Sequence, residues 1–354
     1  MSDQNVALWL PRQGLPKRGA RFEVGSAPYT PPAANEVVVR VRAVAVNPVD
    51  ALPGFLYRVV LPWLTFPAVV GSDVAGEVVA VGTGVTRLRP GDRVLGHAFG
   101  VEKSQNRAAE GAFQHYVVLI QHMVSPIPGS LSFEQAAVLP LALSTAATGL
   151  FQQDHLGLAM PTAEPVERSE TVLVWGGSTS VGSNAIQLAR NAGYRVVATA
   201  SPHNFDYLRS LGAAEVVDRR SRTAVGEIVD LIGAGPLAGT LAIGSGSLVP
   251  AVAIASRTTG GKRVASAQPG WVTRIRGPRA RRPGVRVSGI WGGTLKDNEV
   301  GPGIYVDFLP AALATGAYRA APDATVVGHG LARIPDALRR LRGGVSANKL
   351  VVTV

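Results

Sequence analysis

The chain has 354 residues, of which 46% are hydrophobic, and its formal net charge is +11. It contains no cysteine, which excludes disulfides and thiolate metal sites, and the spacing of its six histidines is not typical of a metal site. No apolar run approaches the roughly 20 residues of a membrane span, and the N-terminus lacks the order of a signal peptide. We therefore expect a cytoplasmic protein of two domains, with no metal and no membrane partner.

The first 140 residues alternate short strand patterns with glycine and proline turns. Strands are expected over 37–45, 69–81, 93–96 and 112–119, which indicates a small, partly open β-barrel. The segment from Leu131 to Leu150 changes to a helical pattern, with Ser132 as its N-cap.

A nucleotide-binding turn is predicted between Thr171 and Gly182. Thr171 to Trp175 forms a buried strand, Gly176 and Gly177 allow a tight turn, and a helix runs from Val181 to Ala192. A helix N-terminus after such a turn offers N–H groups and a positive dipole end to a pyrophosphate. An ordinary strand–helix turn is the alternative for so short a motif.

A second strand over 195–201, a helix over 204–210 and a third strand over 215–218 complete half of a doubly wound sheet. An NAD-preferring fold usually places an acidic residue at the end of the second strand, and this chain has none there. Ser201, His203 and Asn204, with Arg219 or Arg222, would suit a 2′-phosphate instead. We therefore predict NADP(H), the alternative being that these residues only cap a helix.

The remaining elements are less regular. We expect strands over 237–243, 263–267, 285–290 and 348–354, and helices over 248–256, 306–315 and 334–342. The strand over 285–290 is a candidate edge strand that pairs across a two-fold axis, so a monomer and a homodimer both stay open.

The sharpest cluster of positive charge runs from Arg274 to Pro283. It has no interleaved aromatic residue, which favours a solvated loop over a nucleic-acid patch, so nucleic acid is not an expected partner. The basic surface also suits an acidic acyl carrier protein, or reflects only an arginine-rich composition.

With these motifs in place, the chain resembles the medium-chain dehydrogenase/reductase superfamily, and within it the zinc-free quinone oxidoreductase and trans-acting enoyl reductase branch. The matching stretches are NPVD at 47–50, GSDVAGEVVAVGTGV at 71–85, RPGDRV at 89–94, GAFQHYVV at 111–118, VWGGSTSVGSNAIQLA at 174–189, ATASPHNFDYLRSLGA at 198–213 and KLVV at 349–352. The resemblance implies an α/β protein with a GroES-like, partly open β-barrel domain (1–140 and 295–354) and a Rossmann doubly wound parallel-sheet NADP-binding domain (141–294).

The resemblance also implies the cofactor-binding residues. They are Asn47, Pro48, Val49, Asp50, Gly177, Ser178, Thr179, Ser180, Val181, Ser201, Pro202, His203, Asn204, Arg219, Ser266, Ala267, Val345 and Ser346. Four positions depart from relatives, one of them Arg219, which stands where polyketide-pathway relatives tend to have tyrosine. Asn47 and Ser72 stand where zinc alcohol dehydrogenases place a cysteine and a histidine, and Leu52 stands where NPVD relatives often carry a lysine. Zinc-polarised alcohol oxidation is therefore not expected.

The expected activity is an NADPH-dependent, zinc-independent reduction of an enone, an enoyl thioester or a quinone. Candidate hydrogen-bond or proton donors are Asn47, Tyr57 and Thr145, besides the cofactor ribose hydroxyl and water. The alternative role for Tyr57 is that of a packed aromatic side chain. Asp50 is expected to brace its turn rather than to transfer protons. The expected apolar substrate pocket consists of Leu52, Phe55, Leu56, Trp63, Leu141, Ile290, Trp291 and Gly292.

Two other functions stay open at this point. One is a polyketide-type tailoring reductase acting on a carrier-bound acyl chain. The other is a non-catalytic relative that binds NADPH or RNA.

Overall fold

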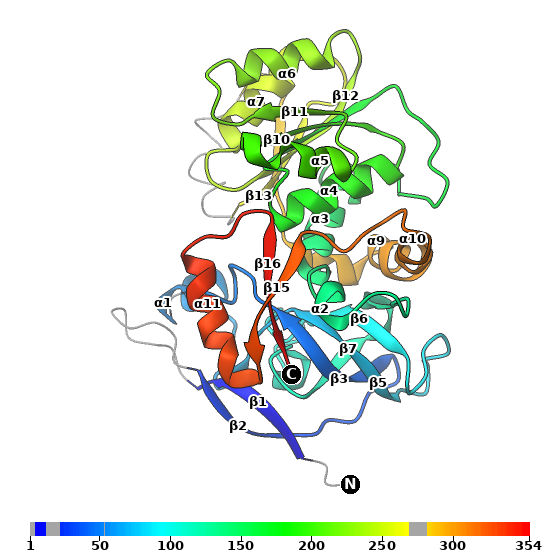
Figure 1. Ribbon diagram of the computed structural model, residues 1–354, viewed down its shortest axis with the longest axis vertical. Coiled ribbons are helices and arrows are strands. Elements are labelled where there is room, and N and C mark those ends of the chain that lie inside the picture. The colour runs from blue at the N-terminus through cyan, green and yellow to red at the C-terminus, as the bar shows by residue number, and fades with distance from the viewer. Residues whose placement is uncertain (1–3, 12–21, 53, 269–281) are drawn as a thin grey trace. The chain divides into compact units, whose positions relative to one another are not determined.

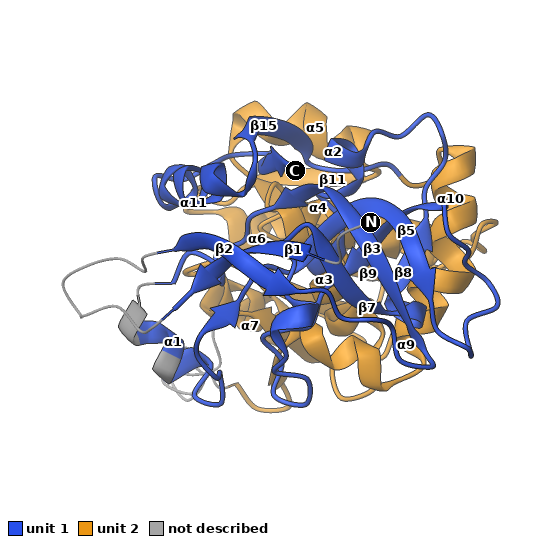
Figure 2. Cartoon of the chain, turned by 90° about the horizontal axis from the view of Figure 1, so that it is seen from below, with its two compact units in different colours: residues 1–141, 319–354 blue, residues 142–318 orange. Residues whose placement is uncertain are grey.

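The computed structural model describes residues 4–11, 22–52, 54–268 and 282–354 (Figure 1). The chain divides into two units, residues 1–141 with 319–354 and residues 142–318 (Figure 2). Most of the arginine run from Arg274 to Pro283 lies outside the described residues, so its predicted solvated loop stays a prediction. No helix in the described part of the chain is long and apolar enough to cross a lipid bilayer.

The first unit is built on two β-sheets. A seven-stranded sheet has the order β15-β16-β3-β5-β6-β8, with β7 also paired to β3, and a smaller sheet has the order β2-β1-β4. The strands are β1 (Gln4–Leu10), β2 (Glu23–Pro28), β3 (Glu36–Ala45), β4 (Ala68–Val69), β5 (Asp73–Val81), β6 (Arg93–His97), β7 (Tyr116–Ile120), β8 (Val124–Pro126), β15 (Asp323–His329) and β16 (Asn348–Thr353).

Strand β3 organises this unit because it pairs antiparallel with β5, β7 and β16. Its valines alternate across a pleated strand, and one set joins the hydrophobic core of the unit. The helices are α1 (Gly54–Val60), α2 (Phe133–Ala136) and α11 (Ile334–Arg342), and α11 packs against β16 (Figure 1).

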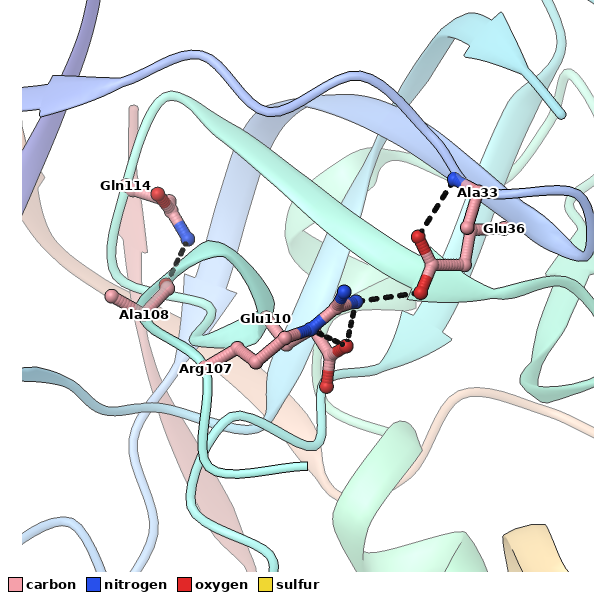
Figure 3. Close-up of polar contacts among 6 residues, drawn as sticks. All are labelled: Ala33, Glu36, Arg107, Ala108, Glu110 and Gln114. Carbon is pink, nitrogen blue, oxygen red and sulfur yellow. Dashed lines mark hydrogen bonds and ion pairs between the residues drawn. The ribbon is translucent and has the colours of Figure 1, made fainter. Parts of the chain in front are cut away.

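A partly exposed cluster of ion pairs, in which only Glu110 is buried, joins a loop to the start of β3. The Arg107 guanidinium binds the Glu36 carboxylate at 2.6 Å and also contacts Glu110, which is 2% exposed (Figure 3). The Gln114 amide donates to the Ala108 carbonyl at 2.9 Å in the same region. The bonds to Glu110 and from Gln114 satisfy two buried polar side chains that would be costly to bury alone.

The second unit is a parallel sheet with the strand order β11-β10-β9-β12-β13-β14. The strands are β9 (Thr171–Trp175), β10 (Arg195–Ala200), β11 (Glu215–Asp218), β12 (Leu237–Ile243), β13 (Arg263–Ala267) and β14 (Arg286–Gly289). This is the 3-2-1-4-5-6 order of a dinucleotide-binding fold, as predicted. Strand β14 lies at an edge of this sheet, as expected, and its pairing across a two-fold axis stays a prediction.

Helices cover both faces of this sheet. On one face α6 (Ala224–Ile232) and α7 (Leu248–Arg257) pack against Leu173 and Trp175 of β9. On the other, α4 (Ser180–Asn191) and α5 (Phe205–Ser210) bring Ile186 and Leu208 toward Ala198 of β10. The two faces use alternate residues of the strands, which explains why the strands read as continuous apolar runs.

Several expected elements need correction. The strand expected over 69–81 forms as two strands, β4 and β5, which belong to different sheets. The single helix expected over 131–150 is two helices, α2 and α3 (Pro140–Phe151), because Pro140 lacks the N–H that a continuous helix needs and suits a first turn. Ser132 does cap α2, in a capping box with Gln135. The chain also forms β1, β2 and β15, which sequence patterns did not indicate.

The domain boundary also differs from the expected one. Residues 295–318, which hold α9 (Val300–Pro302), a π-helix (Gly303–Phe308) and α10 (Leu309–Thr315), belong to the second unit. Side chains explain the difference: the Ser144 and Tyr305 hydroxyls bond at 2.8 Å, and Tyr318 donates to Asn184. These bonds fasten the segment to α3 and α4.

Candidate cofactor and substrate site

The turn from β9 into α4 has the geometry expected of a pyrophosphate-binding loop. Gly176 has a φ of +94°, and a Cβ on Gly182 would lie 2.3 Å from the Gly176 carbonyl oxygen. A Cβ on Gly177 would meet Leu208 at 2.5 Å. Glycine is therefore required at positions 176 and 182, and a Cβ at position 177 would need the Leu208 side chain to shift.

The hydroxyl groups of this loop have different roles. Thr179 is the N-cap of α4: its Oγ1 accepts from the Gly182 N–H at 3.0 Å and donates to the Gly176 carbonyl at 2.8 Å. Ser178, Ser180 and Val181 are partly exposed around the first turn. The first N–H groups of a helix have no partner within the helix, so Ser180 and Val181 are the backbone donors best placed for an anion.

At the end of β10 the chain continues through Ser201 into a 3₁₀ turn, Pro202–Asn204. Pro202 and His203 are exposed, Ser201 is half-buried, and Asn204 is buried with its N–H donating to the Ser201 carbonyl at 2.9 Å. The structure therefore places Ser201 and His203 at the carboxyl edge of the sheet, where a dinucleotide ribose is bound in such folds.

Arg219 lies beside this segment. Its N–H donates to the Ala200 carbonyl at 3.1 Å, directly after the register pair of Ala200 with Asp218, and its side chain is exposed. The Asp218 carboxylate belongs to the third strand and accepts from the Arg220 N–H at 3.0 Å. Ser201 and His203 thus follow the strand whose end carries the ribose-selecting acidic residue in NAD-preferring folds, and Arg219 starts beside that strand end.

Sequence reasoning missed a second glycine-rich segment, Gly244 to Ser247, at the end of β12. Gly244 and Gly246 both have a φ of +82°, and neither would place a Cβ within 4 Å of another group. The Gln268 Nε2 donates to Ser247 Oγ at 2.9 Å, while Gln268 Oε1 has no partner in the described structure. The repeat of glycine and serine directly after an apolar strand was the available signal.

Ser266, a predicted cofactor residue, is fully buried in β13, and its Oγ has no partner among the described residues. Ala267 is half-buried at the end of this strand. Orphaned buried oxygens on Ser266 and Gln268 at the carboxyl edge of a parallel sheet fit a polar ligand that supplies the missing hydrogen bonds.

Thr145 and the predicted pocket residues after β14 lie together in the second unit. A Cβ on Gly292 would be 2.6 Å from Thr145 Oγ1, so the backbone passes directly over that hydroxyl. Ile290 is 8% exposed with its side chain against Gly149, and Trp291 is 37% exposed. Thr145, Ile290 and Gly292 are therefore brought together, with Trp291 at the surface.

In the first unit, the turn from Asn47 to Asp50 is braced by its own side chains. Asp50 Oδ2 accepts from the Asn47 N–H at 2.9 Å, which confirms the bracing role expected of Asp50. Pro48 is exposed and Val49 is half-buried. Burial, together with the nearby Asp73 charge, raises the Asp50 pKa to about 7, against the Lys349 charge and the hydrogen bond from Asn47.

The Tyr57 hydroxyl donates to the Asp50 carbonyl oxygen at 2.9 Å and the residue is 1% exposed. Burial, and then the Asp50 charge, raises the pKa of Tyr57 well above its usual value. A role for Tyr57 in proton transfer stays a prediction, and this geometry favours the packed aromatic instead.

The buried centre of the first unit is a charged cluster of Asn47, Asp73 and Lys349. Lys349 Nζ lies 2.9 Å from Asp73 Oδ2 and donates to Asn47 Oδ1 at 2.5 Å. Asn47 Nδ2 donates to the same Asp73 oxygen at 2.8 Å. Their exposures are 4% for both Asn47 and Lys349 and 0% for Asp73.

Strand register explains why these three residues meet. Ala45 of β3 faces Asp73 of β5 on one side and Val351 of β16 on the other. Continuing the antiparallel register by two residues brings Asn47 opposite Lys349. Sequence reasoning missed Asp73 and Lys349 as site residues, although a charged residue at the head of an apolar strand was visible in both GSDVAG and KLVV.

The other predicted pocket residues of the first unit are partly buried. Leu52 and Trp63 pack against the hydrophobic core, and Trp63 Nε1 donates to the Val101 carbonyl at 3.0 Å. Leu56 is half-buried, and the Phe55 side chain lies outside what the structure describes. Leu141 is half-buried and its N–H donates to Asp73 Oδ1 at 2.6 Å.

Val345 and Ser346, predicted to close over the cofactor, are exposed between α11 and β16.

Comparison with known proteins decides the family. Residues 33–129 match the model of the alcohol dehydrogenase GroES-like domain, and residues 180–304 match the zinc-binding dehydrogenase model. A dehydrogenase of Aspergillus niger, azaJ, is 46% identical over 96% of this chain and 97% of its own length. The chain belongs to the medium-chain dehydrogenase/reductase superfamily.

Two further comparisons place this dehydrogenase/reductase among its relatives. The trans-enoyl reductase himH of Aspergillus japonicus is 34% identical, covering 99% of this chain and 97% of its own. The solved quinone oxidoreductase of Coxiella burnetii shares the fold, with a TM-score of 0.69 and 23% identity over 99% of both chains. The chain is an oxidoreductase of this superfamily, with a GroES-like and a Rossmann-like domain, and the family implies a nicotinamide cofactor and a small-molecule substrate.

This dehydrogenase/reductase has residues that fit such a cofactor and do not fit zinc. The glycine turn, the helix N-terminus and the orphaned oxygens of Ser266 and Gln268 suit a dinucleotide. By contrast, no group of three or more potential metal ligands occurs in the described ranges. Lys349 also places a positive charge against the oxygens of Asn47 and Asp73, where a metal cation would be repelled.

Proposed function

We propose that this protein is an NADPH-dependent, zinc-independent reductase that transfers hydride to an activated carbon–carbon double bond or to a quinone. The observation that carries the cofactor choice is the backbone bond from Arg219 to Ala200, which starts the Arg219 side chain beside the end of β10, a strand that does not itself end in a carboxylate. The neighbouring β11 ends in Asp218, whose carboxylate accepts from the Arg220 N–H. A charge-assisted bond from arginine to a phosphate is stronger than a neutral one.

When bound, the cofactor supplies the hydride. The protein must hold the acceptor, exclude water and stabilise negative charge on the oxygen that becomes an enolate or phenolate. Asn47 offers a neutral donor for this purpose: its Nδ2 carries two hydrogens, and the bond to Asp73 uses one of them. Thr145 is the candidate donor of the second unit.

The proposed substrate is an apolar enone, enoyl thioester or quinone. Each unit offers apolar side chains for such a substrate: the half-buried Leu52 and Leu56 in the first unit, and Ile290 in the second. The trans-enoyl reductase named among the relatives supports the enoyl class. The same relative favours a second candidate, reduction of an acyl chain attached to an acyl carrier protein.

The test is steady-state oxidation of NADPH with a panel of enones, enoyl thioesters and quinones. We expect turnover with at least one class and no effect of a metal chelator. Absence of turnover with every class, or loss of activity on chelation that zinc restores, contradicts the proposal. A higher kcat/KM with a carrier-bound thioester than with the free thioester supports the carrier-bound form.

A further inference from the structure

In the buried cluster of Asn47, Asp73 and Lys349, an ion pair is also hydrogen-bonded to a neutral carboxamide, which a purely structural ion pair does not require. A carboxylate and an ammonium that are both buried pay a large desolvation cost, and well-packed apolar residues often replace such a pair without loss of stability. Lys349 and Asp73 are nevertheless both hydrogen-bonded to one carboxamide, that of Asn47.

The chemistry of the two charged partners permits only one orientation of this carboxamide. The lysine ammonium can only donate, so it must face Asn47 Oδ1. The Asp73 carboxylate accepts from Asn47 Nδ2, and its other oxygen accepts from the Leu141 N–H at 2.6 Å. If Oδ1 and Nδ2 of Asn47 exchanged places, the amide nitrogen would face the Lys349 ammonium, and the amide oxygen would face the Asp73 carboxylate. Neither pair could form a hydrogen bond.

We propose that Lys349 is a positioning residue for the reduction: it occupies the place of a cation between Asn47 and Asp73 and fixes which way the Asn47 carboxamide donates. The inference rests on the proposed function, since it assigns the second Nδ2 hydrogen of Asn47 to the reacting oxygen. It also accounts for the poor fit to zinc, because the ammonium supplies the positive charge that Asp73 needs.

The double variant Asp73→Asn/Lys349→Met separates positioning from stability. It removes both charges together, so no unpaired buried charge is left, as it would be in Lys349→Met alone. The Leu141 N–H holds the oxygen of the new asparagine, whose amide nitrogen then faces Asn47. Asn47 should respond by turning its Oδ1 toward that nitrogen, so the double variant should fold with the carboxamide reversed.

We expect the double variant to regain most of the thermal stability that Lys349→Met loses, while its kcat stays at least about 10-fold below that of the unchanged protein. The KM for NADPH should change by less than about 2-fold, because the cluster does not hold the phosphate groups. The matched control is Lys296→Met, which removes another buried lysine, paired with Asp297 in the second unit. It should leave kcat unchanged.

A double variant with both the stability and the kcat of the unchanged protein would overturn the inference, because Lys349 would then be only structural. A readout independent of turnover is the side-chain amide signal of Asn47 in ¹⁵N NMR, assigned with Asn47→Asp. A changed signal in Lys349→Met supports the inference, and an unchanged signal overturns it. If the unchanged protein shows no turnover, the proposed function fails, and the NMR result still decides whether Lys349 orients Asn47.

Discussion

Arg219 donates its backbone N–H to the Ala200 carbonyl over 3.1 Å, so an exposed arginine that directly follows the third strand of the parallel sheet starts beside the end of the second strand. We predict that Arg219→Ala raises the KM for NADPH about 10-fold or more and leaves the KM for NADH unchanged, because a hydrogen bond to a charged group contributes about 1.5–3 kcal/mol. Arg209→Ala, which removes a cation paired with Asp206 on α5, is the control. Equal effects of Arg219→Ala on both cofactors would contradict the assignment.

The glycine at position 182 leads to a second prediction. A Cβ there would lie 2.3 Å from the Gly176 carbonyl oxygen, so Gly182→Ala must open the turn. We expect a lower melting temperature and at least about 10-fold weaker NADPH binding, measured by calorimetry and fluorescence titration.

Gly226→Ala is the matched control for this change. Gly226 lies within α6 and its Cβ would meet nothing within 4 Å, so alanine should stabilise the protein by about 0.5–1 kcal/mol. If Gly182→Ala binds NADPH as tightly as the unchanged protein does, the turn does not hold the cofactor.

The buried carboxyl of Asp50 predicts a pH dependence of stability. The Asp50 pKa is about 7 in the folded protein, and we take the ordinary value of 3.8 for the unfolded chain. Between these two pH values the folded state holds a proton that the unfolded chain has lost. The Asp50 contribution to the free energy of unfolding is therefore highest below about pH 4, falls as the pH rises to about 7 and is level above that.

Asp50→Asn should remove this fall, because the amide oxygen can still accept from the Asn47 N–H and the side chain does not ionise. Urea unfolding at a series of pH values measures the difference, with Asp206→Asn on α5, whose side chain is exposed, as the control. Parallel pH profiles of Asp50→Asn and the unchanged protein would contradict the shifted pKa.

Tyr57 gives a prediction that separates packing from catalysis. Tyr57→Phe removes the hydroxyl that donates to the Asp50 carbonyl, which should cost about 1 kcal/mol of stability. We expect kcat to fall less than about 3-fold, since a buried hydroxyl with a raised pKa is a poor acid. A loss of kcat above about 100-fold, with stability unchanged, would restore Tyr57 as the proton donor.

The second unit was largely predictable because its information is local. The run from Thr171 to Trp175, the glycines after it and the helix pattern to Ala192 indicate one strand–turn–helix, and the structure confirms it. The Arg219 position followed from the same reasoning, because parallel strands end at one edge of a sheet.

The charged cluster of the first unit could not be predicted in the same way. Asn47, Asp73 and Lys349 lie on three segments far apart in the sequence, and their meeting depends on the register of β16 against β3. A one-residue change in register would turn Lys349 to the other face of the sheet. Strand β2, of sequence EVGSAP, was missed because its glycine and proline are rare in strands.

The central claim is that the dinucleotide bound by this protein carries a 2′-phosphate. Fluorescence or calorimetric titration of the purified protein with NADPH and NADH tests it most directly. The structure predicts that NADPH binds at least about 10-fold more tightly, because Ser201 and His203 follow β10, which does not end in a carboxylate, and Arg219 starts beside them. Failure to bind NADPH, or tighter binding of NADH, would contradict the account.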